Sequence, residues 1–484
     1  MNVDYPIKEI IQRARLGRKS IYPFKNEKFK FSIFGATIYQ ENKRFFTLDD
    51  IIITPPQFTP LRLKKAIELV NREPIYHDVE TKSEIGGFKT SIPFIQSSMG
   101  SQDDWNIVSV YSAKACAKKG VIYGIGENVA STWGYDKRIN DNQPCFIERI
   151  LSYLDNCKED LGGVVIQQNE EDAFDELWNK IYSDKRLDQY IQEGKIAFEI
   201  KAGQGAKAGL GGEKIVDRMT AKRLKDKYII YPDPDSVDAE YYERHSSPDI
   251  FTEEILYNRI RKIKNDYPRV KVWLKTGPYR DLDCVIDIAS KAGADCVVID
   301  GKEGGTGMSP TIALQDLGLP ALACLKKIYD ARKRGVTTSL VLSGRLYNGS
   351  HLVKAVGLGA SGIAAGRAFL ISSYAYPLSE KVISSNLYSN PIIRAIQKIL
   401  RIPNEKSIQF ISNYIETVEI ETKMLVSAVG KYNIKDLKNE DFASFYKEIA
   451  QMFQIKYIYE SEMIEKHFEK QLFDDFKNIY PNKS

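Results

Sequence analysis

The chain has 484 residues, of which 43% are hydrophobic and 27% are charged, so it can form one large domain with extensions and fill its core. Its 69 Lys and Arg residues against 64 Asp and Glu residues leave a net charge of +5, spread along the chain. Because there is no concentrated basic field and no run of about 18 uninterrupted apolar residues, we expect neither a nucleic-acid partner nor a membrane span.

The six cysteines contain no CxxC pair, and three of them fall in apolar segments of strand or helix type. This pattern is typical of small core residues in a reducing compartment and predicts neither disulfides nor a metal site. The first residues, MNVDYP, are polar and lack a charged and apolar leader. We therefore expect a soluble, cytoplasmic protein.

Eight apolar runs of strand length recur along the chain with helical segments between them. They are residues 93–96, 121–123, 164–167, 196–200, 272–274, 296–299, 340–342 and 363–365. Buried parallel strands read as continuous apolar runs, and an eightfold alternation with helices closes most simply into a barrel. The predicted fold class is α/β, a (β/α)8 TIM barrel with an N-terminal arm and a helical C-terminal extension. A doubly wound sheet is the alternative.

The segments around these strands suggest how the chain is organised. Residues 1–90 mix basic, aromatic and proline-bearing stretches and resemble a wrapping arm. The barrel then occupies residues 91–380, with a long insertion at 201–270 that we expect to form a lid over its mouth. Residues 381–484 are charged and helical in pattern, so we expect this extension to cover the barrel or to mediate contact in a homo-oligomer.

A glycine-rich turn directly follows the sixth apolar run. Residues 300–310 read DGKEGGTGMSP, which places three glycines and a threonine in four consecutive positions. At the carboxyl end of a buried strand, such a turn lets backbone N–H groups approach a flat or anionic ligand closely. The turn therefore predicts the floor of a cofactor site.

Two later turns suggest a phosphate site. The seventh and eighth runs end in Gly344-Arg345 and in Gly366-Arg367. In this fold the last two turns commonly bind a phosphate, here through backbone N–H groups and guanidinium groups. The alternative is that these glycines only permit tight turns and that the arginines face water.

Lys275 ends the fifth apolar run, so its ammonium group is expected to point into the barrel mouth. A buried cation needs an anionic partner, because an unpaired charge is costly or loses its proton. The N1–C2 edge of a reduced flavin, where negative charge collects, is such a partner. The alternative is a solvated lysine at the end of a strand.

Three further residues could serve a substrate. Gln204 and Lys207 lie in the glycine-rich opening of the insertion and offer donors suited to a carboxylate. Glu127 follows the second run and is the best-placed carboxylate for proton transfer or ammonium binding. For Glu127, a surface carboxylate is the alternative.

Several motifs together resemble the FMN-binding domain of the glutamate synthase family. They are GQGAKAG at residues 203–209, IDGKEGGTGMSP at 299–310, SGRL at 343–346 and GASGIAAG at 359–366. The similarity extends upstream through REP at 72–74 and SSMG at 97–100, and downstream through LVSAVG at 425–430. It covers roughly residues 50–430, and the combination is specific although each motif alone is not.

The resemblance implies a barrel that holds FMN across the carboxyl ends of its strands and reduces 2-iminoglutarate, formed from 2-oxoglutarate and ammonia. The family's flavin floor falls on Ser98, Met99 and Gly100, and its flavin-edge lysine falls on Lys275. Its residues near the ring system fall on Gly304, Gly305 and Thr306. Its phosphate site falls on Gly344, Arg345, Gly366 and Arg367, its substrate-side residues on Gln204 and Lys207, and its acidic residue on Glu127.

The chain also departs from this family. Glutamate synthases place three cysteines of an iron–sulfur cluster after the last phosphate turn, but residues 368–484 contain no cysteine. The chain begins without a glutaminase domain, and the family's Gly-Glu-Gly-Gly motif is GENV at residues 126–129. Ala208 stands where the family usually has proline. A protein partner that supplies ammonia or electrons is therefore expected.

Three functions remain open at this stage. The first is a glutamate synthase-like oxidoreductase that transfers a hydride from reduced FMN to the imine of a 2-oxo acid such as 2-oxoglutarate. The second is an FMN-dependent amino-group transferase resembling N-methylglutamate synthase, which needs no external electrons. The third is a flavin-binding subunit of a larger complex.

Overall fold

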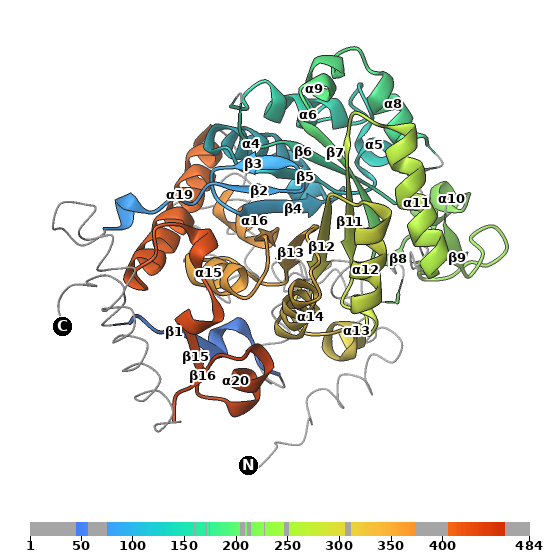
Figure 1. Ribbon diagram of the computed structural model, residues 1–484. Coiled ribbons are helices and arrows are strands. Elements are labelled where there is room, and N and C mark those ends of the chain that lie inside the picture. Colours follow the sequence, from blue (N-terminus) through green and yellow to red (C-terminus); the bar gives the residue numbers. More distant parts are fainter. Residues whose placement is uncertain are drawn as a thin grey trace, which may run out of the picture.

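Eight parallel strands close into a barrel in the order β11-β12-β13-β14-β4-β5-β6-β7 (Figure 1). This computed structural model describes residues 45–56, 75–158, 160–169, 172–173, 175–203, 209–210, 214–226, 228–245, 251–304, 311–373 and 405–459. The barrel strands are β4 (Phe94–Met99), β5 (Tyr123–Ile125), β6 (Val164–Gln168), β7 (Ile196–Ala202), β11 (Lys271–Thr276), β12 (Cys296–Asp300), β13 (Ser339–Ser343) and β14 (Gly362–Ala365). Each predicted run overlaps one of them. The predicted TIM barrel is confirmed, and its closure excludes the doubly wound sheet.

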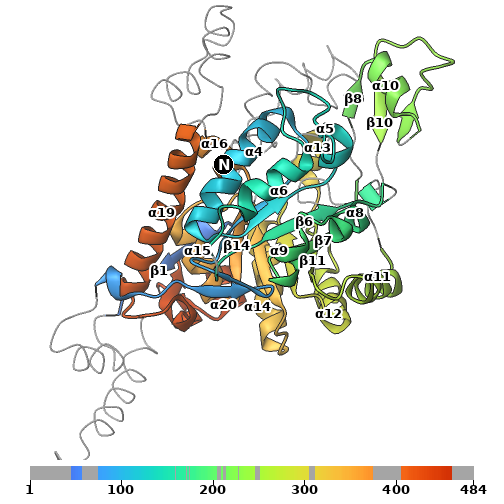
Figure 2. The same ribbon diagram turned by 90° about the horizontal axis from the view of Figure 1, so that it is seen from above.

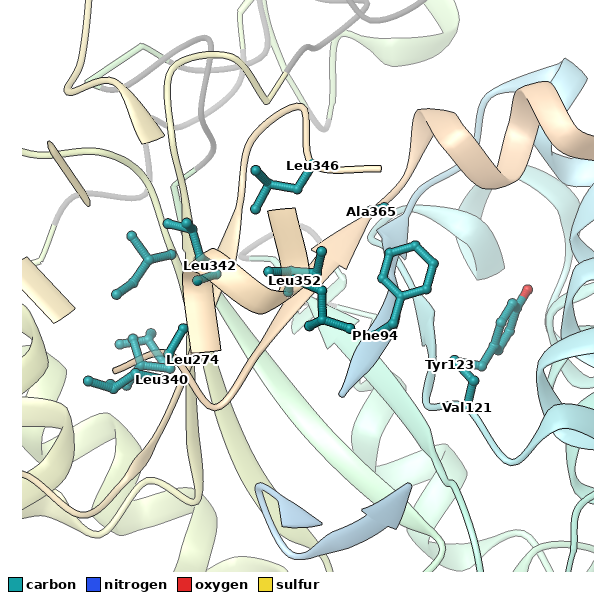
Figure 3. Packing of buried hydrophobic residues seen from close by; sticks show 14 of the residues in the cluster. Phe94, Val121, Tyr123, Leu274, Leu340, Leu342, Leu346, Leu352 and Ala365 are labelled. Carbon is teal, nitrogen blue, oxygen red and sulfur yellow. The ribbon is translucent and has the colours of Figure 1, made fainter. Parts of the chain in front are cut away.

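Helices cover the outside of the barrel. They are α4 (Asp103–Lys119), α5 (Val129–Trp133), α6 (Phe146–Leu154), α8 (Leu177–Ser183), α9 (Asp188–Gln192), α11 (Glu253–Asp266), α12 (Leu282–Ala292), α13 (Thr311–Asp316), α14 (Ala321–Lys333), α15 (Gly349–Gly357) and α16 (Arg367–Ser373). Outward strand residues such as Phe94 and Leu342 lie in one buried cluster with helix residues such as Leu352 (Figure 3). Burial of this layer is the main source of stability for the barrel.

A hairpin closes the amino-terminal end of the barrel. Its strands are β2 (Ser83–Ile85) and β3 (Phe88–Thr90). Ile85 and Phe88 belong to the apolar cluster inside the barrel, and the Trp273 indole N–H donates to the Gly86 carbonyl at 3.1 Å. A Cβ atom on Gly86 would lie 2.5 Å from the indole ring of Trp273, so only glycine fits there. The hairpin lies within the predicted N-terminal arm and plugs one end of the barrel.

The segments before and after the barrel pair with each other. Strand β1 (Ile51–Ile53) is antiparallel to β15 (Phe442–Ser444), which is parallel to β16 (Lys456–Tyr457). The long helix α19 (Glu405–Ala428) packs against α4, α15 and α16 (Figure 1). The other elements here are α20 (Lys447–Phe453) and the 3-10 turns η3 (Leu48–Asp50), η4 (Tyr76–Asp78), η7 (Ile434–Asp436) and η8 (Asn439–Asp441). The extension thus contains two short strands besides the predicted helices.

The insertion after β7 contains a small antiparallel sheet. Its elements are β8 (Lys214–Val216), α10 (Arg218–Leu224), β9 (Ile229–Tyr231) and β10 (Tyr242–His245), with the strand order β8-β10-β9. Figure 2 shows this unit at one side of the barrel. The last part of the predicted insertion is α11, a helix of the barrel wall that packs against α12. The lid itself stays a prediction, because residues 204–208 and 211–213 lie outside the described residues.

Among the helices in the described ranges, none is both long enough and apolar enough to cross a membrane.

Candidate active site at the carboxyl ends of the strands

The side chains inside the barrel change from apolar to polar toward the carboxyl ends of the strands. Successive inward positions on a strand are two residues apart. On β11, Trp273 belongs to the apolar interior and Lys275 lines a cavity. On β12 the same step leads from Val298 to Asp300, and on the other strands from Val165 to Gln167, from Ala197 to Glu199 and from Val341 to Ser343. The polar ends converge on the barrel mouth.

A cavity of about 490 Å³ occupies this mouth. Every predicted site residue within the described ranges lines it: Ser98, Met99, Gly100, Glu127, Lys275, Gly304, Gly344, Arg345, Gly366 and Arg367. The structure thus brings together residues that are far apart in the sequence. Gln204, Lys207, Gly305 and Thr306 lie outside the described residues, so their positions stay predictions.

One end of the cavity is formed by the two glycine–arginine turns. Gly344 has φ +130°, and a Cβ atom on Gly366 would lie 3.0 Å from the Met99 sulfur. Arg345 has φ 58°, in the left-handed region that a non-glycine residue adopts only at a cost. Burial, together with the neighbouring Arg345 guanidinium, lowers the pKa of Arg367 to about 10. An anion between the two guanidinium groups would relieve this repulsion.

Lys275 is buried beside the cavity and is not a solvated lysine. Its side chain is 8% exposed, and its Nζ donates to the Ser97 hydroxyl at 3.3 Å. The same Nζ lies 3.9 Å from the Asp300 carboxylate, which also accepts a hydrogen bond of 2.8 Å from the Ser343 hydroxyl. The anionic partner that a buried lysine requires is therefore present on the neighbouring strand.

Glu127 forms an ion pair with Lys201 at the other side of the cavity. The Lys201 Nζ lies 2.6 Å from the Glu127 carboxylate, and the two side chains are 6% and 15% exposed. Both residues line the cavity. Glu127 is thus not a surface carboxylate, and Lys201 is a cavity residue that the sequence reading did not single out.

Glu303 joins the cavity to a smaller one. Its carboxylate accepts a hydrogen bond of 2.7 Å from the Ala321 N–H at the start of α14. It lines the main cavity and an adjoining space of about 260 Å³ that also contacts Thr47, Asp49 and His351. Burial raises the pKa of Glu303 to about 7, although backbone N–H donors and Lys302 oppose this rise. The carboxyl group can therefore gain or lose a proton near neutral pH.

The sequence reading missed several other polar residues of the mouth. They are Ser97, Gln167, Glu199, Lys201, Asp300, Glu303 and Ser343. Most stand two residues beyond an apolar inward position near the end of a predicted strand. That alternation was visible in the sequence and could have identified them. Among the described residues, no group of three or more His, Cys, Asp or Glu side chains is arranged to hold a metal ion.

Comparison with known proteins identifies related sequences. The model of a family described as a conserved region in glutamate synthase matches residues 187–432. A glutamate synthase large subunit-like protein of Rhizobium meliloti is 29% identical over 284 residues, which are 54% of this chain and 61% of that protein. An archaeal-type glutamate synthase (NADPH) of Thermotoga maritima is 35% identical over 188 residues, which are 38% of this chain and 36% of that protein. The chain thus spans less than two thirds of the length of these relatives.

A solved structure shares the fold. A flavocytochrome b2 variant with sulfite bound has a TM-score of 0.51 and 12% sequence identity, and the match covers 96% of each chain. Because the sequence identity is only 12%, this similarity shows the fold alone.

Proposed function

Because the chain belongs to the glutamate synthase family, whose conserved region matches residues 187–432, we propose that it is an FMN-dependent oxidoreductase. FMN is the cofactor of this barrel. The proposed reaction is the reduction of the imine of a 2-oxo acid such as 2-oxoglutarate. The observation that carries the proposal is that one cavity brings these features together. Two glycine–arginine turns form one end of it, and the buried Lys275 and the Glu127–Lys201 ion pair line other parts of its wall.

The residues present fit FMN in charge and in shape. A terminal phosphate would lie between Arg345 and Arg367, both of which line the cavity and carry guanidinium groups suited to donate to it. Gly344 and Gly366 carry no side chain there, and a Cβ atom on Gly366 would lie 3.0 Å from the Met99 sulfur. Lys275 would face the edge of the ring system where negative charge collects on reduction. When bound, FMN supplies the hydride that such a reduction needs.

The protein's own residues would orient the substrate and move a proton. Hydride addition to the imine carbon must be matched by a proton on the imine nitrogen. The Nζ of Lys201, held 2.6 Å from Glu127, carries a proton that could be donated to this nitrogen, and the negative charge of Glu127 would retain an ammonium group nearby. Gln204 and Lys207 are proposed, on the sequence alone, to bind the substrate carboxylates.

The supply of ammonia and electrons belongs to the proposal as well. We propose that a protein partner supplies ammonia or electrons to the barrel, because residues 368–484 contain no cysteine that could bind an iron–sulfur cluster. The Thermotoga maritima relative carries NADPH in its name, which makes NADPH the first electron donor to test.

The proposal is tested with purified protein and FMN. The protein should be yellow or should turn yellow with FMN, and should quench flavin fluorescence. After anaerobic reduction, addition of 2-oxoglutarate and ¹⁵N-ammonia should reoxidise the flavin and yield ¹⁵N-glutamate, detected by mass spectrometry. A colourless protein that takes up no FMN would contradict the cofactor assignment. A yellow protein inert toward every 2-oxo acid would contradict the substrate class.

The same experiment separates the alternative functions. Exchange of labelled nitrogen between amino acids in the absence of any reductant would favour an amino-group transferase. Tight binding of FMN with no turnover, until a partner protein is added, would favour a flavin-binding subunit.

A further inference from the structure

The turn that carries Arg345 is held by segments outside the barrel. It runs from the end of β13 at Ser343 to the start of α15 at Gly349. Gly344 has φ +130° and Arg345 has φ 58°. A backbone of this kind persists only where the surrounding contacts fix it. The contacts that fix the turn are therefore part of whatever site the turn forms.

Helix α19 of the C-terminal extension makes two of these contacts. The Tyr414 hydroxyl donates to the Tyr347 carbonyl at 2.6 Å. One turn and a half further along the helix, the Glu421 carboxylate accepts a hydrogen bond of 2.8 Å from the Gly349 N–H. The Tyr414 ring lies edge-on to two phenylalanine rings of the barrel, with 5.8 Å between the ring centroids in each pair. The position of its hydroxyl is therefore fixed by packing.

His351 holds the other polar group of the Tyr347 backbone. Its Nδ1 accepts a hydrogen bond of 3.3 Å from the Tyr347 N–H. Because a backbone N–H can only donate, the ring proton lies on Nε2, which donates to the Asp49 carboxylate at 3.0 Å. The His351 side chain is 4% exposed, and Asp49 belongs to η3 of the N-terminal segment. Both extensions of the barrel thus meet at the backbone of Tyr347.

The Tyr414 hydroxyl acts through the turn and not on a bound molecule. Tyr347 and Tyr414 line the cavity together with Arg345. Burial raises the pKa of Tyr414, so its hydroxyl keeps its proton at neutral pH. A phenol has one proton to donate, and the Tyr347 carbonyl takes it. An anion at this end of the cavity is therefore affected by Tyr414 through the position of Arg345.

We propose that Tyr414, with His351 on the opposite side of the Tyr347 backbone, is a positioning residue that holds the Arg345 turn in its phosphate-binding form. Helix α19 would then set how strongly the site prefers a flavin with a phosphate over one without. This preference rests on the proposed function, whereas the holding of the turn is a property of the chain itself. The two parts can be tested separately.

The first test uses the protein without added flavin. Tyr414→Phe removes the hydroxyl and keeps the ring among its neighbours. Hydrogen exchange of the backbone N–H groups in peptides that cover residues 344–350, followed by mass spectrometry, reports how often the turn opens. Since one hydrogen bond is lost, this exchange should be at least about threefold faster than in the native chain. Native exchange rates in folded Tyr414→Phe would overturn the proposal, whatever cofactor the protein binds.

Tyr123→Phe is the matched control. The Tyr123 hydroxyl also donates to a backbone carbonyl, that of Ser109 at 3.0 Å, but Tyr123 does not line the cavity. This variant should leave the exchange of residues 344–350 unchanged. Circular dichroism and thermal unfolding establish that each variant is folded. Equal acceleration in Tyr123→Phe and Tyr414→Phe would reveal a general loosening and would also overturn the proposal.

Two amide substitutions test the part assigned to His351. His351→Asn keeps an acceptor close to the position of Nδ1, where the Tyr347 N–H donates, but does not reach Asp49. His351→Gln keeps a donor close to the position of Nε2 and loses the acceptor for Tyr347. Exchange of the turn should therefore be faster in the Gln variant than in the Asn variant. Equal exchange in the two variants would remove His351 from the proposal.

The second test compares FMN with riboflavin, which lacks only the phosphate. Fluorescence quenching gives the two dissociation constants, and the preference for FMN should fall at least about threefold in Tyr414→Phe. A general loss of stability would weaken both flavins alike and leave the preference unchanged. An unchanged preference despite faster exchange would overturn the phosphate part. Failure of the native chain to bind FMN would instead contradict the proposed function, and the exchange rates would still decide whether Tyr414 holds the turn.

Discussion

The two ends of the barrel are built from the same strands but have opposite characters. At the amino-terminal end, Trp273 packs against the β2–β3 hairpin, and the interior is apolar and closed. Two residues further along β11, Lys275 lines a polar cavity. A single step of two residues along the strand thus separates the apolar layer, which stabilises the barrel, from the polar layer that lines the cavity. In barrels of this class stability and chemistry are divided in this way between the two ends.

The largest expected effect comes from opening the closed end. Trp273→Ala should lower the free energy of unfolding by about 3–5 kcal/mol, because it leaves a cavity beneath the hairpin. Urea unfolding measures this loss. Trp273→Phe, which keeps a ring but loses the bond to Gly86, should cost less. FMN affinity of the folded fraction should change little, and a large loss of affinity without a loss of stability would contradict the division between the ends.

A second prediction concerns pH and the open end. The pKa of Glu303 is raised to about 7 in the folded chain, above the usual 4.5, so the folded state binds more protons than the unfolded state between these values. Its contribution to stability is therefore complete below about pH 4.5 and is lost as the pH rises through 7.

Glu303→Gln removes this dependence. The stability of the variant relative to the native chain should increase by about 3 kcal/mol from pH 4.5 to pH 8, an order-of-magnitude figure obtained from the size of the shift. Urea unfolding at several pH values measures the difference. A difference that does not change with pH would show that Glu303 does not titrate in this window.

The third prediction compares two lysines of one strand. Lys275→Ala should reduce turnover of the FMN-loaded protein at least about 100-fold, equivalent to about 2.7 kcal/mol, while FMN still binds. Lys271, at the closed end of β11, lies over the Phe88 ring at 4.5 Å and serves as the control. Lys271→Ala should lower stability and leave turnover unchanged. Equal losses of turnover in both variants would contradict the assignment of chemistry to one end.

The smallest expected effect concerns Arg345, in the turn after β13, where two substitutions distinguish the role of its charge from the cost of its backbone strain. Arg345 has φ 58°, so Arg345→Gly should raise the free energy of unfolding by about 0.5–1 kcal/mol. The loss of the guanidinium group should weaken FMN binding about tenfold, as measured by fluorescence quenching. Arg345→Ala should weaken binding equally without the gain in stability. Unchanged FMN affinity in both variants would place the phosphate elsewhere.

The sequence was sufficient to predict the barrel because the pattern that marks each strand lies within a few consecutive residues. Each strand is a continuous apolar run, and the turns after β12, β13 and β14 carry their glycines beside the strand that positions them. Since parallel strands all end at the same side of a barrel, residues such as Lys275 and Arg367 had to meet at one mouth. Positions at the ends of the predicted strands were therefore enough to predict that these residues line one cavity.

Other features depended on contacts between distant segments. The ion pair of Lys201 with Glu127 joins residues from the ends of β7 and β5, and a shift of register in β4 between Gln96 and Met99 accompanies the contact of Ser98 with Glu199. The pairing of β1 with β15 likewise joins residues near the two ends of the chain. No local pattern encodes such partners.

By itself, the sequence determined which strands form and which glycine-bearing turns follow them at the carboxyl ends. Only the tertiary structure decided that the β2–β3 hairpin plugs the barrel and that Glu199 accepts hydrogen bonds from Ser98 and Gln167. The physical reason is that alternation along a strand says which side chains point inward, whereas closure and stagger of the barrel set which inward side chains meet.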